Sequence, residues 1–139
     1  MRYIIYTDGA SLGNPGKAGA GIAIYENQNS EPTKEYAIPL GNMTNNQAEY
    51  SALVFALKKI KQLLGKDNVK ESDIEIRSDS ELLVRQLNHQ YKILDPKVKE
   101  LFFEAWNLLI DFGRVQFISI PREQNTRADY LSKKGANAN

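Results

Sequence analysis

Residues 2–16 read RYIIYTDGASLGNPG, an apolar run followed by a dense series of turn-forming residues. The β-branched and aromatic side chains of residues 2–7 are typical of a β-strand. The glycines and the Asn-Pro pair that follow predict a tight loop that begins at Asp8. This stretch therefore predicts a first strand that ends at an acidic residue.

Two further segments, residues 19–25 and residues 34–40, have strand-like composition and are separated by a polar stretch. Short polar connections of this kind join antiparallel neighbours, so the three strands are expected to form a meander. Pro39 cannot donate a ladder hydrogen bond, and we therefore expect the third strand to lie at an edge of the sheet.

The hydrophobic period then changes from that of a strand to that of a helix. Apolar residues recur at helical spacing at Leu53, Leu57, Ile60 and Leu64. Thr44 and Gln47 form a capping-box pattern at the start of this helix, and Gly65 is a plausible stop.

The remainder of the chain alternates predicted strands and helices. The expected elements are a strand over residues 73–78, a short helix over residues 80–88, a long helix from Asp95-Pro96 to Gly113, a strand over residues 115–120, and a final helix capped by Asn125 or Thr126 that runs into residues 135–139. The order βββαβαβα predicts an α/β fold. We expect a five-stranded mixed sheet, three antiparallel strands then two parallel ones, flanked by helices and forming a single domain over residues 1–139.

Composition narrows the possible chemistry. The chain has 139 residues, 42% of them hydrophobic, with a net charge of +1, one His and no Cys. Disulfides and thiolate zinc sites are thereby excluded, and a histidine-built metal site is disfavoured. No apolar run approaches the ~20 residues of a membrane span. Since no targeting segment is recognised either, we expect a cytoplasmic protein with no membrane role.

Four acidic residues stand at places where strands end or helices begin. Asp8 and Asp79 follow predicted strands, whereas Glu49 and Asp129 lie near the starts of predicted helices. Each alone is explained by turn chemistry or by the helix dipole. If the fold gathers them, however, two carboxylates about 4 Å apart repel by roughly 4 kcal/mol at an effective dielectric of about 20. A hard divalent cation such as magnesium would relieve that repulsion, because such ions prefer oxygen ligands.

The motifs around these acids resemble those of ribonuclease HI, and the resemblance covers nearly all of the chain. They are, in order, Tyr6-Thr7-Asp8-Gly9-Ala10-Ser11, Gly13-Asn14-Pro15-Gly16, Thr44-Asn45-Asn46-Gln47-Ala48-Glu49, Ser78-Asp79-Ser80 and Asn125 to Asp129. The resemblance implies a ribonuclease H-like fold. It also implies that Asp8, Glu49, Asp79 and Asp129 hold two magnesium ions, for which manganese can substitute.

The implied activity is endonucleolytic hydrolysis of the RNA strand of an RNA/DNA hybrid, with 5′-phosphate and 3′-hydroxyl products. Two-metal chemistry of this kind needs no protein nucleophile. The implied substrate-binding residues are Gly9, Ser11, Asn14, Thr44, Asn45 and Asn46. Short polar groups of this type can read the 2′-hydroxyl that distinguishes RNA from DNA.

The chain departs from the family pattern at two places. Many members carry a His in the loop before the last metal-binding Asp, whereas this chain has Arg122, which can donate hydrogen bonds to a phosphate but cannot act as a base. The basic insertion found in some relatives is absent between Asn88 and Pro96. We therefore expect modest, salt-sensitive affinity for the hybrid.

Other functions remain open at this stage. Transposases, junction resolvases and some exonucleases share the architecture, and cleavage of double-stranded RNA is a further variant. A non-catalytic hybrid-binding module is possible on any such fold, although the intact acid set argues against it. An aspartic-protease interpretation fails, because the sequences flanking Asp8 and Asp79 differ. No obligate protein partner is indicated, and a monomer is the default expectation.

Overall fold

A five-stranded sheet forms the centre of the computed structural model, which describes residues 1–139. Its spatial order is β3-β2-β1-β4-β5. The strands are β1 (Arg2–Ser11), β2 (Gly16–Glu26), β3 (Lys34–Met43), β4 (Asp73–Ser78) and β5 (Arg114–Ser119). The pairs β1–β2 and β2–β3 are antiparallel, whereas β1–β4 and β4–β5 are parallel. The predicted mixed sheet is confirmed, and β3 with Pro39 lies at an edge as expected.

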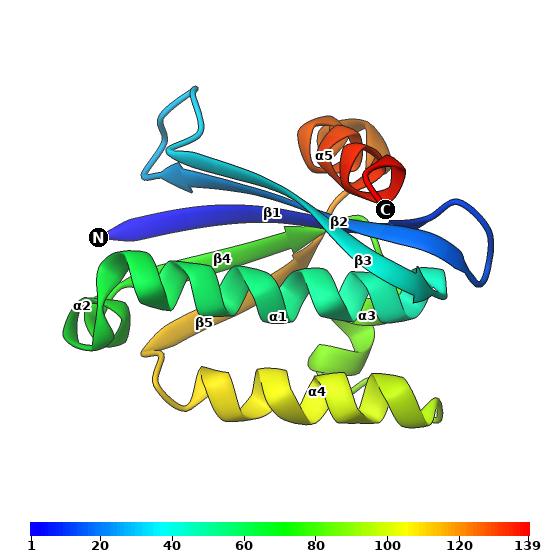
Figure 1. Cartoon of the computed structure of the whole chain (residues 1–139). Coiled ribbons are helices and arrows are strands. Elements are labelled where there is room, and N and C mark those ends of the chain that lie inside the picture. The colour runs from blue at the N-terminus through cyan, green and yellow to red at the C-terminus, as the bar shows by residue number, and fades with distance from the viewer.

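Helices cover both faces of this sheet. They are α1 (Asn45–Leu64), α2 (Lys66–Glu71), α3 (Glu81–Leu87), α4 (Pro96–Leu109) and α5 (Thr126–Asn137), with a short 3₁₀ turn over Arg122–Gln124. Figure 1 shows α5 alone on one face, whereas α1 lies on the other face with α4 packed against its far side. None of these helices combines the length and apolar character needed to cross a bilayer.

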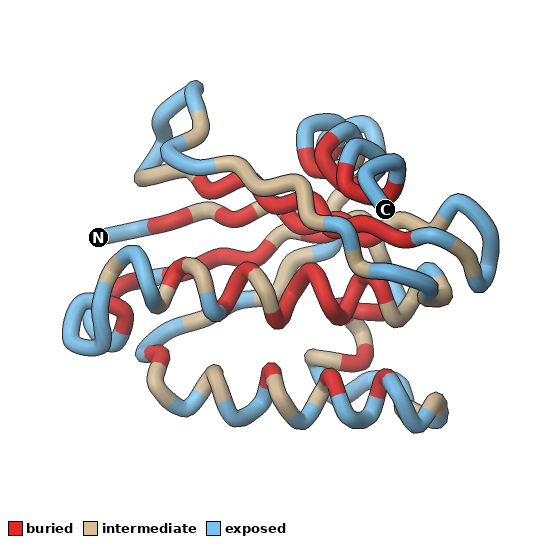
Figure 2. Tube along the Cα trace, viewed as in Figure 1, coloured by how far each residue is buried: buried red, intermediate tan, exposed pale blue.

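The hydrophobic core lies between the sheet and α1. Leu53, Leu57 and Ile60 project from α1 and are fully buried or nearly so, as the helical spacing predicted. Leu64, the last residue of the predicted stripe, is only partly buried, and Tyr50 is buried as well. They pack against an isoleucine-rich sheet face, and buried positions run along the length of α1 in Figure 2. The helix that carries Glu49 is thus held firmly against the sheet.

Two predicted helix starts are confirmed by their hydrogen bonds. The Thr44 hydroxyl accepts from the Gln47 backbone N–H at 3.2 Å, and the Gln47 side chain accepts from the Thr44 N–H at 3.1 Å. At α4, the Asp95 carboxylate accepts from the Lys97 N–H at 2.8 Å, and Pro96 occupies the first turn. Local sequence therefore determined both helix starts.

Two predicted boundaries were wrong, and one short helix was not predicted. The first strand does not end at Asp8: β1 continues to Ser11, because residues 9–11 pair with β2. A short helix, α2, follows Gly65 where none was predicted, and it buries Val69. The long helix ends at Leu109 rather than near Gly113.

The expected side-chain cap of the last helix is also absent. Asn125 precedes α5 but makes no capping hydrogen bond. Its amide instead donates to the Thr7 carbonyl at 3.0 Å in a buried contact. The Asn125 side chain thus satisfies a buried strand carbonyl and does not cap the helix. This hydrogen bond joins the start of α5 to β1 beside Asp8.

Helix α5 approaches the sheet so closely that only glycine fits beneath it. A Cβ atom at Gly21 would lie 2.1 Å from the Ala128 carbonyl oxygen and 2.5 Å from the Ser132 nitrogen. Gly19 lies equally close to Ser132 and Ala136, and on the helix itself Gly135 lies against the Ile38 backbone. The backbones of α5 and the sheet are therefore in direct contact.

This contact predicts the effect of a single methyl group. Gly21→Ala is expected to lower the free energy of unfolding by about 3 kcal/mol, because a backbone clash cannot be relieved by rotating a side chain. Chemical unfolding followed by circular dichroism measures this loss. Ser30→Ala, in the exposed turn between β2 and β3, serves as the control and is expected to change stability by less than about 0.5 kcal/mol. A loss at Gly21 no larger than that of the control would contradict the tight packing of α5.

Candidate active site

The parallel pairing of β1 and β4 brings Asp8 and Asp79 together. Thr7 pairs with Ser78, so the next residue of each chain segment is an aspartate at the same level of the sheet. Strand β4 ends at Ser78, whereas β1 continues to Ser11. The edge of β1 is consequently open beyond Thr7. This is the carboxyl end of two adjacent parallel strands, where open α/β sheets commonly place ligands.

Glu49 reaches this point from α1. A Cβ atom at Gly9 would lie 2.2 Å from the Ala48 carbonyl carbon and 2.3 Å from the Glu49 nitrogen, so the first turn of α1 touches the β1 backbone. The Gly9 N–H donates a hydrogen bond to the Glu49 carboxylate. The close packing of α1 therefore requires a glycine at position 9.

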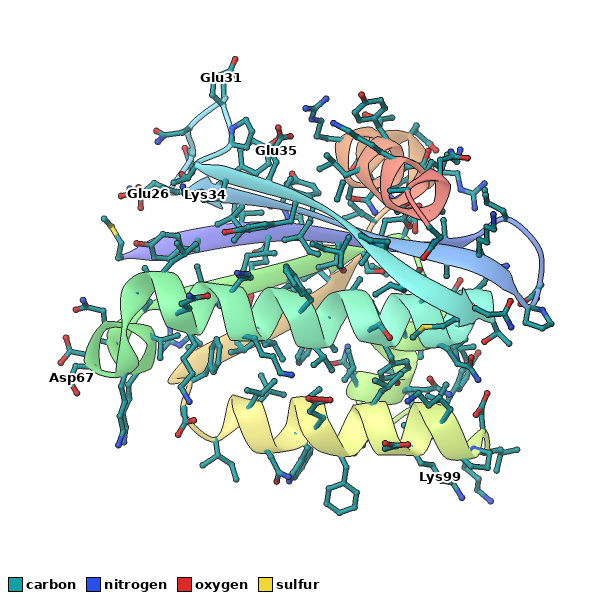
Figure 3. All side chains as sticks on the ribbon, in the orientation of Figure 1. Glu26, Glu31, Lys34, Glu35, Asp67 and Lys99 are labelled. Atoms are coloured by element: carbon teal, nitrogen blue, oxygen red, sulfur yellow. The ribbon has the colours of Figure 1, made fainter.

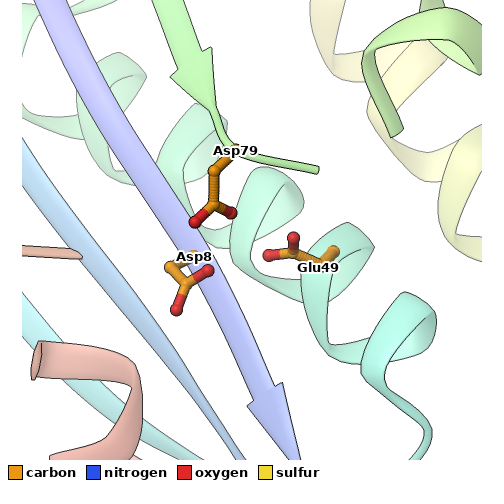
Figure 4. Close-up of side chains that lie close together, drawn as sticks. All are labelled: Asp8, Glu49 and Asp79. Atoms are coloured by element: carbon orange, nitrogen blue, oxygen red, sulfur yellow. The ribbon is translucent and has the colours of Figure 1, made fainter. Parts of the chain in front are cut away.

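Three of the four predicted acids form a tight cluster. One carboxylate oxygen from each of Asp8, Glu49 and Asp79 lies within 4.8 Å of the others. Figure 4 shows these side chains converging from β1, α1 and the end of β4. Only 5% of Asp8 and 7% of Glu49 is exposed to solvent. The cluster faces a cavity of about 430 Å³ that also contains Arg122 and Asp129.

The fourth acid, Asp129, lies on the same cavity but outside the tight cluster. It stands in the first turn of α5, and its carboxylate pairs with the Lys133 ammonium at 3.1 Å. Both partners are partly exposed, so the ion pair itself adds little to stability. Its effect is to place a positive charge beside the acidic cluster.

Burial and crowding change the acidity of the cluster. Burial raises the pKa of Asp8 to about 7; the charges of Asp79 and Asp129 act in the same direction, and a hydrogen bond from Ser132 opposes them. Burial and the Asp8 charge raise the pKa of Glu49 well above its ordinary range. Burial also raises the pKa of Asp79, although Arg122 acts against it. The folded protein thus resists holding all of these charges without a compensating cation.

Arg122 is the cation nearest to Asp79. Its Nε atom lies 3.8 Å from the Asp79 carboxylate, and 86% of its side chain is exposed. It stands in the 3₁₀ turn before α5 and lines the cavity. A long, exposed guanidinium at this position can reach a ligand in the cavity as well as Asp79.

The predicted substrate-binding residues divide into two groups. Gly9, Ser11, Asn45 and Asn46 line the cavity, whereas Asn14 and Thr44 do not. The Asn14 side-chain oxygen Oδ1 accepts from the Asn45 backbone N–H at 3.0 Å, and the Asn45 side-chain oxygen Oδ1 accepts from the Ser11 backbone N–H at 3.0 Å. These bonds join the β1–β2 loop to the start of α1. Both amides therefore also hold the rim of the cavity in place.

Asn46 differs from these two amides. Its side-chain oxygen is buried and has no hydrogen-bond partner within the protein. An unpaired polar atom costs free energy unless a ligand or solvent satisfies it. The residue lines the cavity, so its side-chain amide borders the space that a bound molecule would occupy.

Sequence reasoning missed two residues on α5. Lys133 pairs with Asp129, and Ser132 donates to Asp8 at 2.6 Å. Both lie one helical turn after Asp129, at the i+3 and i+4 positions, which is the only signal that could have pointed to them. A lysine and a serine at such spacing are common on any helix, so the pattern alone does not indicate a site.

Comparison with known proteins places the chain among nucleases and related domains. Residues 6–135 match the family described as reverse transcriptase-like. The chain is 37% identical over 129 residues to ribonuclease HI of Halobacterium salinarum, covering 93% of this chain and 61% of that protein. It is 32% identical over 138 residues to the bifunctional protein Rv2228c of Mycobacterium tuberculosis, covering 99% of this chain and 36% of that protein.

The solved structures include one in which a similar protein holds a nucleic acid. The crystal structure of LC11-RNase H1 in complex with an RNA/DNA hybrid superposes with a TM-score of 0.90 and is 38% identical. It covers 98% of this chain and 97% of that one. The likeness therefore extends over the whole fold and is not confined to the acidic motifs.

The raised pKa of Asp8 predicts a stability effect that depends on pH. Its pKa rises from an ordinary value of 3.8 to about 7 on folding, so the metal-free protein loses stability as the pH rises through this interval. Asp8→Asn removes the charge. We expect the metal-free variant to be more stable than the wild type at pH 8, with a difference that shrinks towards pH 4. Urea unfolding in the presence of a chelator measures both trends.

Asp67→Asn is the matched control for this experiment. Asp67 is exposed on α2, away from the site, as Figure 3 shows. Its substitution is expected to leave the pH dependence of stability unchanged. If metal-free Asp8→Asn is instead less stable than the wild type at pH 8, then the hydrogen bond that Asp8 accepts from Ser132 stabilises the fold by more than its buried charge costs, and the argument from the raised pKa fails.

Proposed function

The chain belongs to the ribonuclease H type 1 family. We propose that it is an endonuclease that cleaves the RNA strand of RNA/DNA hybrids at internal positions. The single observation that carries this proposal is the convergence of Asp8, Glu49 and Asp79, within 4.8 Å, on a cavity rimmed by asparagines. The hybrid held by LC11-RNase H1 supports the choice of substrate. The chain spans 36% of the length of Rv2228c and 61% of that of the Halobacterium ribonuclease HI, and the proposal concerns the matched part alone.

The donor set fits divalent cations of the magnesium type. It consists of carboxylate oxygens without a nitrogen or sulfur ligand. Burial and, after it, the neighbouring carboxylates raise the pKa of Asp8 and of Glu49, and a bound cation would favour their ionised forms. We propose that Asp8, Glu49, Asp79 and Asp129 would hold two ions. Two such ions would activate the attacking water and neutralise the charge that develops on the phosphate.

The protein's own groups orient the carboxylates that would hold the ions. The Gly9 N–H and the Ser132 hydroxyl fix the carboxylates of Glu49 and Asp8, so these side chains need not reorganise on loading. Because no serine, cysteine or histidine nucleophile lies in the cavity wall in a triad arrangement, we propose direct hydrolysis. Its products would carry 5′-phosphate and 3′-hydroxyl ends.

Recognition of the RNA strand is assigned to the rim of the cavity. Asn46 lines this cavity, and we propose that its side-chain amide hydrogen-bonds a ribose 2′-hydroxyl, a group that DNA lacks. Ser11, Asn45 and the backbone at Gly9 line the same wall, and we propose that they contact the hybrid. Asn14 and Thr44 lie just outside it and would contact only a ligand that extends beyond the cavity.

Cleavage of labelled duplexes tests the proposal directly. The wild type is expected to cut an RNA/DNA hybrid when magnesium is present, and to leave matched DNA/DNA and RNA/RNA duplexes intact. Asp8→Asn and Glu49→Gln are expected to lower the cleavage rate by at least about a thousandfold, because each removes charge from the ion-binding set. Asp67→Asn should cut at the wild-type rate. Cleavage of all three duplexes at equal rates, or none of them, would reject the assignment.

Arg122 provides a second, independent test. It stands where many relatives carry a loop His, and its guanidinium stays protonated, so it can only stabilise or release a phosphate. Arg122→Ala is expected to lower turnover more than tenfold, whereas Arg122→Lys should recover part of that loss. Steady-state cleavage of the hybrid over a range of pH values measures both. Unchanged kinetics in Arg122→Ala would show that the residue is an exposed partner of Asp79 and nothing more.

A further inference from the structure

Ser132 makes a buried contact with the acidic cluster from the side opposite α1. Its residue is fully buried in α5, and its hydroxyl lies 2.6 Å from the Asp8 carboxylate oxygen Oδ2. The two residues are 124 positions apart in the sequence. The contact therefore joins the last helix to the first strand at a proposed ion-binding side chain.

The hydroxyl has a choice of two acceptors. The Asp129 carbonyl oxygen lies 2.8 Å from the Ser132 oxygen, on the preceding helical turn. A hydroxyl carries one hydrogen and can donate to only one of them. A carboxylate is the stronger acceptor, because hydrogen bonds to a charged group are shorter and stronger than those to a neutral carbonyl. When Asp8 is ionised, the hydrogen therefore points to Asp8.

Because of this bond, the two carboxylate oxygens of Asp8 have different partners. Oδ2 is held by Ser132, which lies on α5. In Figure 4, one Asp8 oxygen points towards Glu49 and Asp79 while the other points away from them. Fixing Oδ2 thus sets the rotation of the carboxylate and leaves the remaining oxygen directed at the other two acids.

Packing of α5 does not require the hydroxyl. The close contacts of this residue with the sheet are made by its backbone, since its nitrogen faces Gly21 and its carbonyl oxygen faces Gly19. An alanine would preserve both contacts and favours a helix at least as well as serine does. The contribution of the hydroxyl to the fold is therefore separable from its effect on Asp8.

We propose that Ser132 is a positioning residue that orients the Asp8 carboxylate for a divalent cation. It acts through Asp8 and touches neither substrate nor ion. The proposal rests on the proposed function in so far as that function assigns an ion to Asp8. Removing an outer hydrogen-bond partner of a metal ligand typically costs about 10- to 100-fold in metal affinity or activity.

Manganese binding to the wild type and to Ser132→Ala, followed by titration calorimetry without substrate, tests this proposal. The dissociation constant is expected to rise at least about tenfold in the variant. The circular dichroism spectrum of the metal-free protein and its affinity for hybrid in a chelator are expected to stay at wild-type values. Hybrid cleavage by the variant should recover towards the wild-type rate at saturating manganese. General loosening of the site would prevent that recovery.

Ser51→Ala is the matched control, because Ser51 is also a buried helical serine but its hydroxyl contacts only the Met43 sulfur. It should leave manganese binding unchanged. Equal affinities in the wild type and Ser132→Ala, an equal loss in Ser51→Ala, or a metal-free Ser132→Ala whose circular dichroism spectrum departs from that of the wild type would each overturn the positioning role. So would a wild type that does not bind manganese. A wild type that binds manganese but leaves the hybrid intact would reject the nuclease function and not the role of Ser132.

Discussion

Helix α1 meets strand β1 at Gly9 with no side chain between the two backbones. A Cβ atom at this position would lie 2.2 Å from the Ala48 carbonyl carbon, and the Gly9 N–H donates to the Glu49 carboxylate. The buried apolar face of α1 supplies the force that presses the helix onto the sheet. The missing side chain then sets how close the helix comes, and hence whether Glu49 can share a cation with Asp8.

On the opposite face of the sheet, a second helix also contacts the strand backbones directly at glycines. Helix α5 lies directly on the backbones of Gly19 and Gly21. Its Ser132 side chain donates to Asp8, and Asn125, which precedes the helix, donates to the Thr7 carbonyl. Strand β1 thus contacts a helix on each face of the sheet at the point where it extends beyond the end of β4. The acids converge because two helices on opposite faces approach a single strand closely.

This convergence opposes stability in the absence of a ligand. Buried carboxylates with raised pKa values are a cost that the core must offset, and sites of this kind are a recognised source of the trade-off between activity and stability. The cations adjacent to the site do not remove that cost, since Arg122 and Lys133 are largely exposed. The arrangement is understandable if the charge is compensated by bound ions, as proposed for this member of the ribonuclease H type 1 family.

Local sequence determined the strands, the capping box at Thr44 and the start of α4 at Asp95, because periodicity and capping act over a few residues. It also singled out four acids as candidate ligands, of which the structure clusters Asp8, Glu49 and Asp79. It did not determine that β1 runs on through Asp8 to Ser11, that Asn125 bonds to Thr7, or that Ser132 and Lys133 flank the acids. Nor did it distinguish Asp129, which stands apart from the other three acids. These features arise from contacts between residues up to 124 positions apart, and such contacts exist only once the sheet has formed and both helices have packed against it.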